Sequence, residues 1–143
     1  MKSLGQQLLE ASMQGKTEEV KALVAQGADT NSKDEWGRTS LHFAAGHSST
    51  ETLLFLISAG ADIHVKDKTG ESPLHKAAYN NKIKAVLALL EAGSDVNLRD
   101  DDGLTALHWV AITVSEEASD LLRALMQAGS NINSTDNDGR TAL

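Results

Sequence analysis

The chain has 143 residues, enough for one domain and too few for two independent globular cores. Its 13 Lys and Arg against 20 Asp and Glu give a net charge of −7, which argues against nucleic acid or an anionic membrane as the main partner. The absence of cysteine excludes disulfides, thiolate metal sites and cysteine nucleophiles, and no apolar run approaches the ~18 residues of a membrane span.

Three landmarks recur along the chain and predict a repeated unit. The first is a four-residue turn with Asp first and Gly fourth, a pattern typical of type I turns. These turns begin at Asp34, Asp67, Asp100 and Asp136. The second is a motif ending in Leu-His, which begins 33 residues apart at Thr39, Ser72 and Thr105. The third is a return that starts at Gly27, Gly60, Gly93 and Gly129, where the last step is 36 residues because the fourth unit carries three extra residues.

Within a unit, the landmarks predict a short helix, a loop, a longer helix and an extended return. Thr39, Ser72 and Thr105 are well placed as N-caps of the short helices, and Pro73 suits a first helical position. The longer helices show apolar residues at helical spacing. They are predicted, in chain order, at Thr17–Ala25, Thr50–Ser58, Lys82–Glu91 and Ser115–Gln127. The segment Ser48–Glu51 has the form of a capping box, and the glycine of each return should end its helix in the left-handed conformation.

Three nine-residue stretches carry a resemblance to a known family. Residues 37–45, 70–78 and 103–111 all follow the pattern Gly-x-Thr/Ser-x-Leu-His-x-Ala/Val-Ala, and by it the chain resembles the ankyrin-repeat family. The resemblance implies an all-α solenoid of helix-turn-helix units with hairpin-like turns, about four repeats plus a begun fifth. We expect one domain, 1–143, with units near 4–36, 37–69, 70–102 and 103–138 and a partial unit at 139–143. The first unit lacks the motif, as a capping unit would.

Large side chains at positions that the repeat leaves variable are candidate partner contacts, because Trp and Tyr are enriched among interface hot spots. The resemblance implies that these positions face a concave groove on the inner helices, and that Trp36 stands at a projecting turn tip. Packing between helices is the alternative for Phe43 and Trp109. The expected partner-binding residues are Trp36, Arg38, Phe43, His47, Lys76, Tyr79, Trp109, Ile112 and Thr113.

Other polar residues of the repeat have structural interpretations. The motif histidines, His42, His75 and His108, are expected to hydrogen-bond neighbouring loops, as the resemblance implies, and not to bind metal. His47 and His64 break the period and are expected on the surface. The acidic turns are either solvated turns or a row that steers a basic partner. No reactive constellation, phosphate loop or complete calcium loop occurs in the sequence, so we expect no catalytic residue, no metal and no cofactor.

These observations predict a non-catalytic protein–protein interaction module. It should bind a protein surface or peptide through the concave inner-helix face and the turn tips. The expected partner is another protein, basic or of mixed charge, with no nucleic acid and no membrane insertion. We expect a monomer in the cytoplasm or another intracellular compartment, the nucleus included. The alternative is a regulatory or targeting ankyrin segment of a larger multidomain enzyme or channel, which the begun fifth unit favours.

Overall fold

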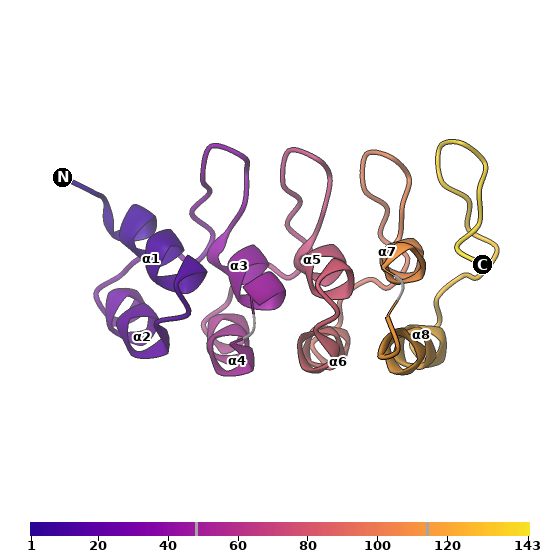
Figure 1. Ribbon diagram of the computed structural model, residues 1–143. Coiled ribbons are helices and arrows are strands. Elements are labelled where there is room, and N and C mark those ends of the chain that lie inside the picture. Colours follow the sequence, from indigo (N-terminus) through magenta and orange to yellow (C-terminus); the bar gives the residue numbers. More distant parts are fainter. Residues whose placement is uncertain (48, 114) are drawn as a thin grey trace.

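The computed structural model describes residues 1–47, 49–113 and 115–143, which form eight helices arranged as a row of four pairs (Figure 1). In chain order the helices are α1 (Leu4–Met13), α2 (Thr17–Ala25), α3 (Ser40–His47), α4 (Thr50–Ser58), α5 (Pro73–Tyr79), α6 (Ile83–Glu91), α7 (Ala106–Ile112) and α8 (Ala118–Gln127). The first helix of each pair lies in an inner row and the second in an outer row, and neighbours pack within both rows. The described residues therefore build the expected all-α solenoid, in which each pair buries its apolar face against the next.

The local signals for helix ends are confirmed at most positions. Ser72 and Thr105 are the N-caps of α5 and α7, each in a capping box with the histidine three residues later, and Pro73 opens α5. Helices α2 and α4 have the predicted bounds. The glycines that follow the outer helices have φ between 87 and 97°, the left-handed conformation that glycine accepts without strain.

Two regions begin their helices where the motif did not predict. In the first unit, Ser3 caps α1 in a capping box with Gln6, so this helix starts before the position that the motif occupies elsewhere. In the fourth unit, α8 starts at Ala118 and not at Ser115, because Ala118 N–H closes a turn onto the Ser115 carbonyl at 3.1 Å. This turn takes up the extra residues of the fourth unit.

Smaller differences concern single residues at helix starts. Helix α6 starts at Ile83, one residue later than predicted, with Lys82 as its N-cap. Of the segment expected to cap α4, Ser48 lies outside the described residues. Ser49 is the N-cap of that helix, and its hydroxyl oxygen accepts from Thr52 N–H at 3.2 Å.

The core is a repeated layer of leucines between the two rows. One buried leucine comes from each inner helix, at the same place in every unit: Leu8, Leu41, Leu74 and Leu107. The outer helices supply another such series: Leu23, Leu56, Leu89 and Leu125. Alanines at 44–45 and 77–78 are also buried, and their small side chains let neighbouring inner helices approach closely.

Four loops, here called the fingers, project side by side from the helix row (Figure 1). They are residues 26–39, 59–72, 92–105 and 128–143. Backbone bonds join successive tips: Lys68 N–H donates to the Trp36 carbonyl at 2.9 Å, and Asp101 N–H to the Thr69 carbonyl at 3.1 Å. Gly70 has φ +77°, and a Cβ there would lie 2.6 Å from the Asp101 amide nitrogen. The close stacking of the fingers therefore requires glycine at this turn.

Candidate binding surface

Each finger is locked by the aspartate that opens its turn. One carboxylate oxygen, Oδ1, accepts the backbone N–H groups of the second and fourth following residues. For Asp34 these are Trp36 and Arg38, at 2.9 and 2.8 Å. The same pair of bonds recurs at Asp67, Asp100 and Asp136. The sequence suggested solvated turns or acidic steering at these positions, but the Asp67 side chain is only 4% exposed and Asp100 only 7%.

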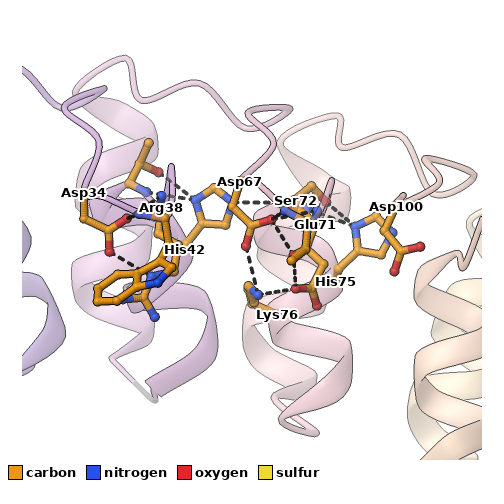
Figure 2. A network of polar contacts seen from close by, with 12 residues as sticks. Asp34, Arg38, His42, Asp67, Glu71, Ser72, His75, Lys76 and Asp100 are labelled. Atoms are coloured by element: carbon orange, nitrogen blue, oxygen red, sulfur yellow. Dashed lines mark hydrogen bonds and ion pairs between the residues drawn. The ribbon is translucent and has the colours of Figure 1, made fainter. Parts of the chain in front are cut away.

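The other carboxylate oxygen, Oδ2, has a different donor in each finger. Asp34 pairs with Arg38 of its own finger at 2.8 Å. Asp67 pairs instead with Lys76 on α5 at 3.0 Å, and Lys76 also pairs with Glu71 (Figure 2). Asp100 accepts from the indole N–H of Trp109 on α7 at 2.9 Å. Two predicted partner contacts, Lys76 and Trp109, are therefore also partners of the finger aspartates.

The polar contacts around Asp67 change its acidity and that of Lys76. Burial alone raises the pKa of Asp67, but hydrogen bonds from Thr69 and Lys76 outweigh burial and leave that pKa below its usual value. Burial alone lowers the pKa of Lys76, but its bonds to Glu71 and Asp67 raise it overall. The pair is therefore charged at neutral pH.

The motif histidines connect α3, α5 and α7 to the finger that follows in the next unit, as expected, and Figure 2 shows His42 and His75. His42 Nδ1 accepts from Thr39 N–H at 3.0 Å, and Nε2 donates to the Glu71 carbonyl at 2.9 Å. His75 repeats this arrangement with the Leu104 carbonyl at 3.0 Å. A ring that accepts at one nitrogen and donates at the other must be neutral. Burial lowers the pKa of both His42 and His75, which favours this neutral form.

Three predicted contacts form a stacked cluster between the first finger and α3. The Arg38 guanidinium lies 4.7 Å from the Trp36 ring centroid and 4.8 Å from that of Phe43. Trp36 is 55% exposed, as expected at a tip. Phe43 is only 6% exposed, so the ring packs between helices, the alternative given for this position, and does not lie open to a partner. The Phe43 ring is covered by Arg38 and by the exposed His47. The His47 ring stacks on that of Phe43, with the ring centroids 6.3 Å apart.

A second cluster lies on α5 and α7. The rings of Tyr79 and Trp109 meet edge to face, with centroids 5.2 Å apart. Tyr79 is 50% exposed and Ile112 is 58% exposed, whereas Trp109 is half-buried. Thr113 caps the end of α7, and its hydroxyl donates to the Trp109 carbonyl at 3.2 Å. Of this cluster, Tyr79 and Ile112 offer the most apolar surface to a partner.

The face formed by α1, α3, α5, α7 and the fingers, here called the inner face, contains two hollows beside the first cluster. One, of about 460 Å³, lies between α1 and the first finger, and its lining includes Leu9, Met13 and Trp36. A smaller one, of about 200 Å³, lies between α3 and α5. The sequence pattern did not single out Met13. Its place 66 residues before Tyr79, twice the repeat length, is the signal that would have found it.

His64 is the other residue whose role was misjudged. It is exposed, as expected, but it does not break the period: it lies midway between Asn31 and Asn97, 33 residues from each. Asn31 Oδ1 accepts from Asp62 N–H at 2.8 Å, and His64 Nε2 accepts from Asp95 N–H at 3.2 Å. The imidazole therefore replaces an asparagine side chain in binding the next return.

Across the described ranges 1–47, 49–113 and 115–143, no group of three or more His, Asp or Glu side chains is placed to hold a metal ion. In the same ranges no helix has the length and apolar character needed to cross a membrane.

Comparison with protein families gives a match over nearly the whole chain. The family sequence model described as "Ankyrin repeats (3 copies)" matches residues 8–100 and again residues 74–143. No curated protein matches the sequence.

Proposed function

Because the chain belongs to the ankyrin-repeat family, we propose that it is a non-catalytic module whose inner face binds another protein. Ankyrin repeats are generally protein–protein interaction modules and typically have no catalytic activity. The proposed units, 4–36, 37–69, 70–102 and 103–138 with 139–143 begun, each contain one inner and one outer helix up to residue 138. The module acts as a monomer and presents its inner face to a peptide or protein surface.

One observation carries this proposal: exposed apolar side chains stand on the inner face beside hollows that a partner can fill. Trp36, Tyr79 and Ile112 are each at least half exposed, although they are large and apolar. Aromatic anchors beside shallow hollows are the usual centres of binding energy in interfaces. The helices and locked fingers hold these side chains in place, so that little conformational freedom is lost on binding.

The predicted contacts fall into three groups according to their exposure and to the bonds that they already make within the chain. Trp36, His47, Tyr79 and Ile112 are exposed and available as direct contacts. Arg38, Lys76 and Trp109 contribute their outward edges while holding a finger aspartate. Phe43 and Thr113 support the surface from below and from the end of α7.

The proposal is tested with peptides selected from a displayed random library on the wild-type protein. The triple variant Trp36→Ala, Tyr79→Ala, Ile112→Ala should weaken binding of the selected peptides at least about tenfold, since hot-spot truncations cost about 1–2 kcal/mol or more each. The matched control is Leu54→Ala with Leu87→Ala on the outer helices, because these leucines are 51% and 50% exposed.

The control variant should bind the selected peptides with unchanged affinity, and both variants should keep the wild-type helix content. A library that yields no binder, or peptides whose affinity falls only with the outer-helix control, would contradict an inner-face binding role.

A further inference from the structure

The two halves of the inner face differ in charge. The first two fingers and the inter-helix loop 14–16 contain six carboxylates and five Lys or Arg. The last two fingers and the loops 80–82 and 115–117 contain eight carboxylates and only three basic residues, two arginines and Lys82. The surroundings of α7 are therefore strongly negative, whereas those of α1 and α3 are balanced.

The arginines of the negative half are occupied within the chain. Arg99 donates to the Gly103 and Thr135 carbonyls, at 3.1 and 2.7 Å. Arg140 pairs with Asp136 at 2.9 Å and with Asp138 at 2.8 Å. Neither arginine neutralises the exposed carboxylates of the third finger.

The exposed carboxylates of this half include Asp101, Asp102 and Glu116. In the ranges that the structure describes, none of these three has an ion-pair partner within 4.0 Å. Asp101 and Asp102 stand at the third fingertip, and Glu116 lies beyond the end of α7. Asp101 and Asp102 therefore belong to the finger that precedes α7, and Glu116 to the loop that follows it.

The same half also presents apolar surface on α5 and α7. Tyr79 and Ile112 are half exposed, and the Trp109 ring contacts Tyr79. Ile112 also lines a hollow of about 250 Å³ between α7 and the fourth finger. This half thus combines apolar anchoring surface with negative charge.

We infer that the C-terminal half of the inner face, from Tyr79 to the fourth finger, binds a basic protein segment that carries a large apolar side chain. The inference rests on the proposed function and specifies the partner. The apolar side chain packs on Tyr79 and Ile112, while flanking Lys or Arg approach Asp101, Asp102 and Glu116. Complementary charge speeds encounter and disfavours acidic competitors, which both these carboxylates and the net charge of −7 repel.

The hollow between α3 and α5 does not favour an acidic partner instead. Its lining includes Arg38 and Lys76. Arg38 is already paired with Asp34, and Lys76 with both Asp67 and Glu71. Three carboxylates thus outnumber two cations in that cluster, so it does not provide a net positive site.

The first test is the composition of the peptides selected from the displayed library on the whole chain. We expect an excess of Lys and Arg flanking a large apolar residue. Peptides that are neutral or acidic overall would overturn this inference while leaving the proposed function intact if the inner-face triple alanine variant still abolishes their binding. A library without any binder would overturn both.

The second test uses neutral isosteres. The variant Asp101→Asn, Asp102→Asn, Glu116→Gln should weaken binding of the selected peptides about tenfold, because charges at an interface rim contribute modestly but together. The matched control, Glu18→Gln, Glu91→Gln, Asp120→Asn, removes the same number of exposed carboxylates from the outer helices. The affinity of this control variant for the selected peptides should change less than about twofold.

Salt provides an independent readout of the same contacts. Raising the ionic strength from about 0.05 to about 0.5 M should weaken binding to the wild type more than to the three-carboxylate variant. The inference would be overturned if the three-carboxylate variant and its matched control lost the same affinity for the peptides. It would also be overturned if salt weakened binding equally in the wild type and the three-carboxylate variant.

Discussion

The end fingers and the middle fingers use the same aspartate lock with different second donors. In the first and fourth fingers, an arginine four residues after the aspartate, Arg38 or Arg140, takes Oδ2. In the second and third fingers that position is Glu71 or Leu104, and the donor comes from the inner helix. The backbone geometry is the same, but the middle fingers are tied to the helices that a partner would contact.

This difference decides which inner-face positions are available. Where Arg38 serves Asp34, the equivalent helix position is free to hold Phe43, and Trp36 remains exposed at the tip. Where Lys76 and Trp109 serve the lock, only their neighbours Tyr79 and Ile112 remain as exposed apolar contacts. A variable position in the repeat is therefore not necessarily a free one.

The largest expected difference comes from removing the aspartate in a middle and in an end finger. Asp100→Ala should lower the free energy of unfolding by about 3 kcal/mol, because two backbone N–H groups and the Trp109 indole lose a buried acceptor. Asp34→Ala should cost only about 1 kcal/mol, since water reaches a side chain that is 17% exposed. Urea unfolding measures the free energy of unfolding of both variants. Equal losses of stability would contradict the difference between middle and end fingers.

Next in size is the loss of the cation. Lys76→Met leaves Asp67 and Glu71, with side chains 4% and 15% exposed, facing each other without a counter-ion. We expect a loss of about 2 kcal/mol, against less than about 1 kcal/mol for Arg38→Met at the more exposed Asp34. Adding Glu71→Gln to Lys76→Met should recover part of the stability. No recovery would mean that the lysine stem, not its charge, supports the finger.

The histidine ties predict an acid-sensitive fold. Because burial lowers the folded-state pKa of His42 and His75 below the unfolded value near 6.5, the unfolded chain binds more protons. Their stabilisation is complete above about pH 6.5 and decreases as the pH falls toward the folded-state pKa, by about 1 kcal/mol per residue for each pH unit. Asp67, whose pKa is also lowered, adds a separate loss only below about pH 4.

Unfolding in urea at several pH values between about 7.5 and 5 measures this dependence. His75→Gln should be less stable at neutral pH but should show a shallower decline with acid than the wild type. An unchanged slope would indicate that His75 does not control the response.

The smallest expected effect separates the two roles of Trp109. Trp109→Phe keeps a ring beside Tyr79 and removes only the N–H bond to Asp100. Stability should fall by about 1 kcal/mol, while affinity for selected peptides should stay within about twofold. The reverse result, a tenfold weaker affinity at unchanged stability, would mean that the indole N–H of Trp109 binds the partner and not Asp100.

Local sequence was sufficient for the repeat, most helix ends and the glycine turns. N-caps such as Ser72, the first-turn Pro73 and the left-handed glycines act within a few residues of their own position. The 33-residue period then placed the leucines in one layer, because identical units bury the same face. The resemblance to the ankyrin-repeat family also implied that the motif histidines bind neighbouring loops.

Tertiary structure alone decided burial and pairing on the inner face. Stacking of the units covers Phe43 and brings His64 to the next return. It also brings Lys76 and Trp109 within bonding distance of the aspartate nine residues earlier. The sequence lists the available donors and acceptors. Which of them meet is fixed by distance in the folded chain, where an unpaired buried carboxylate or amide costs more free energy than any local preference supplies.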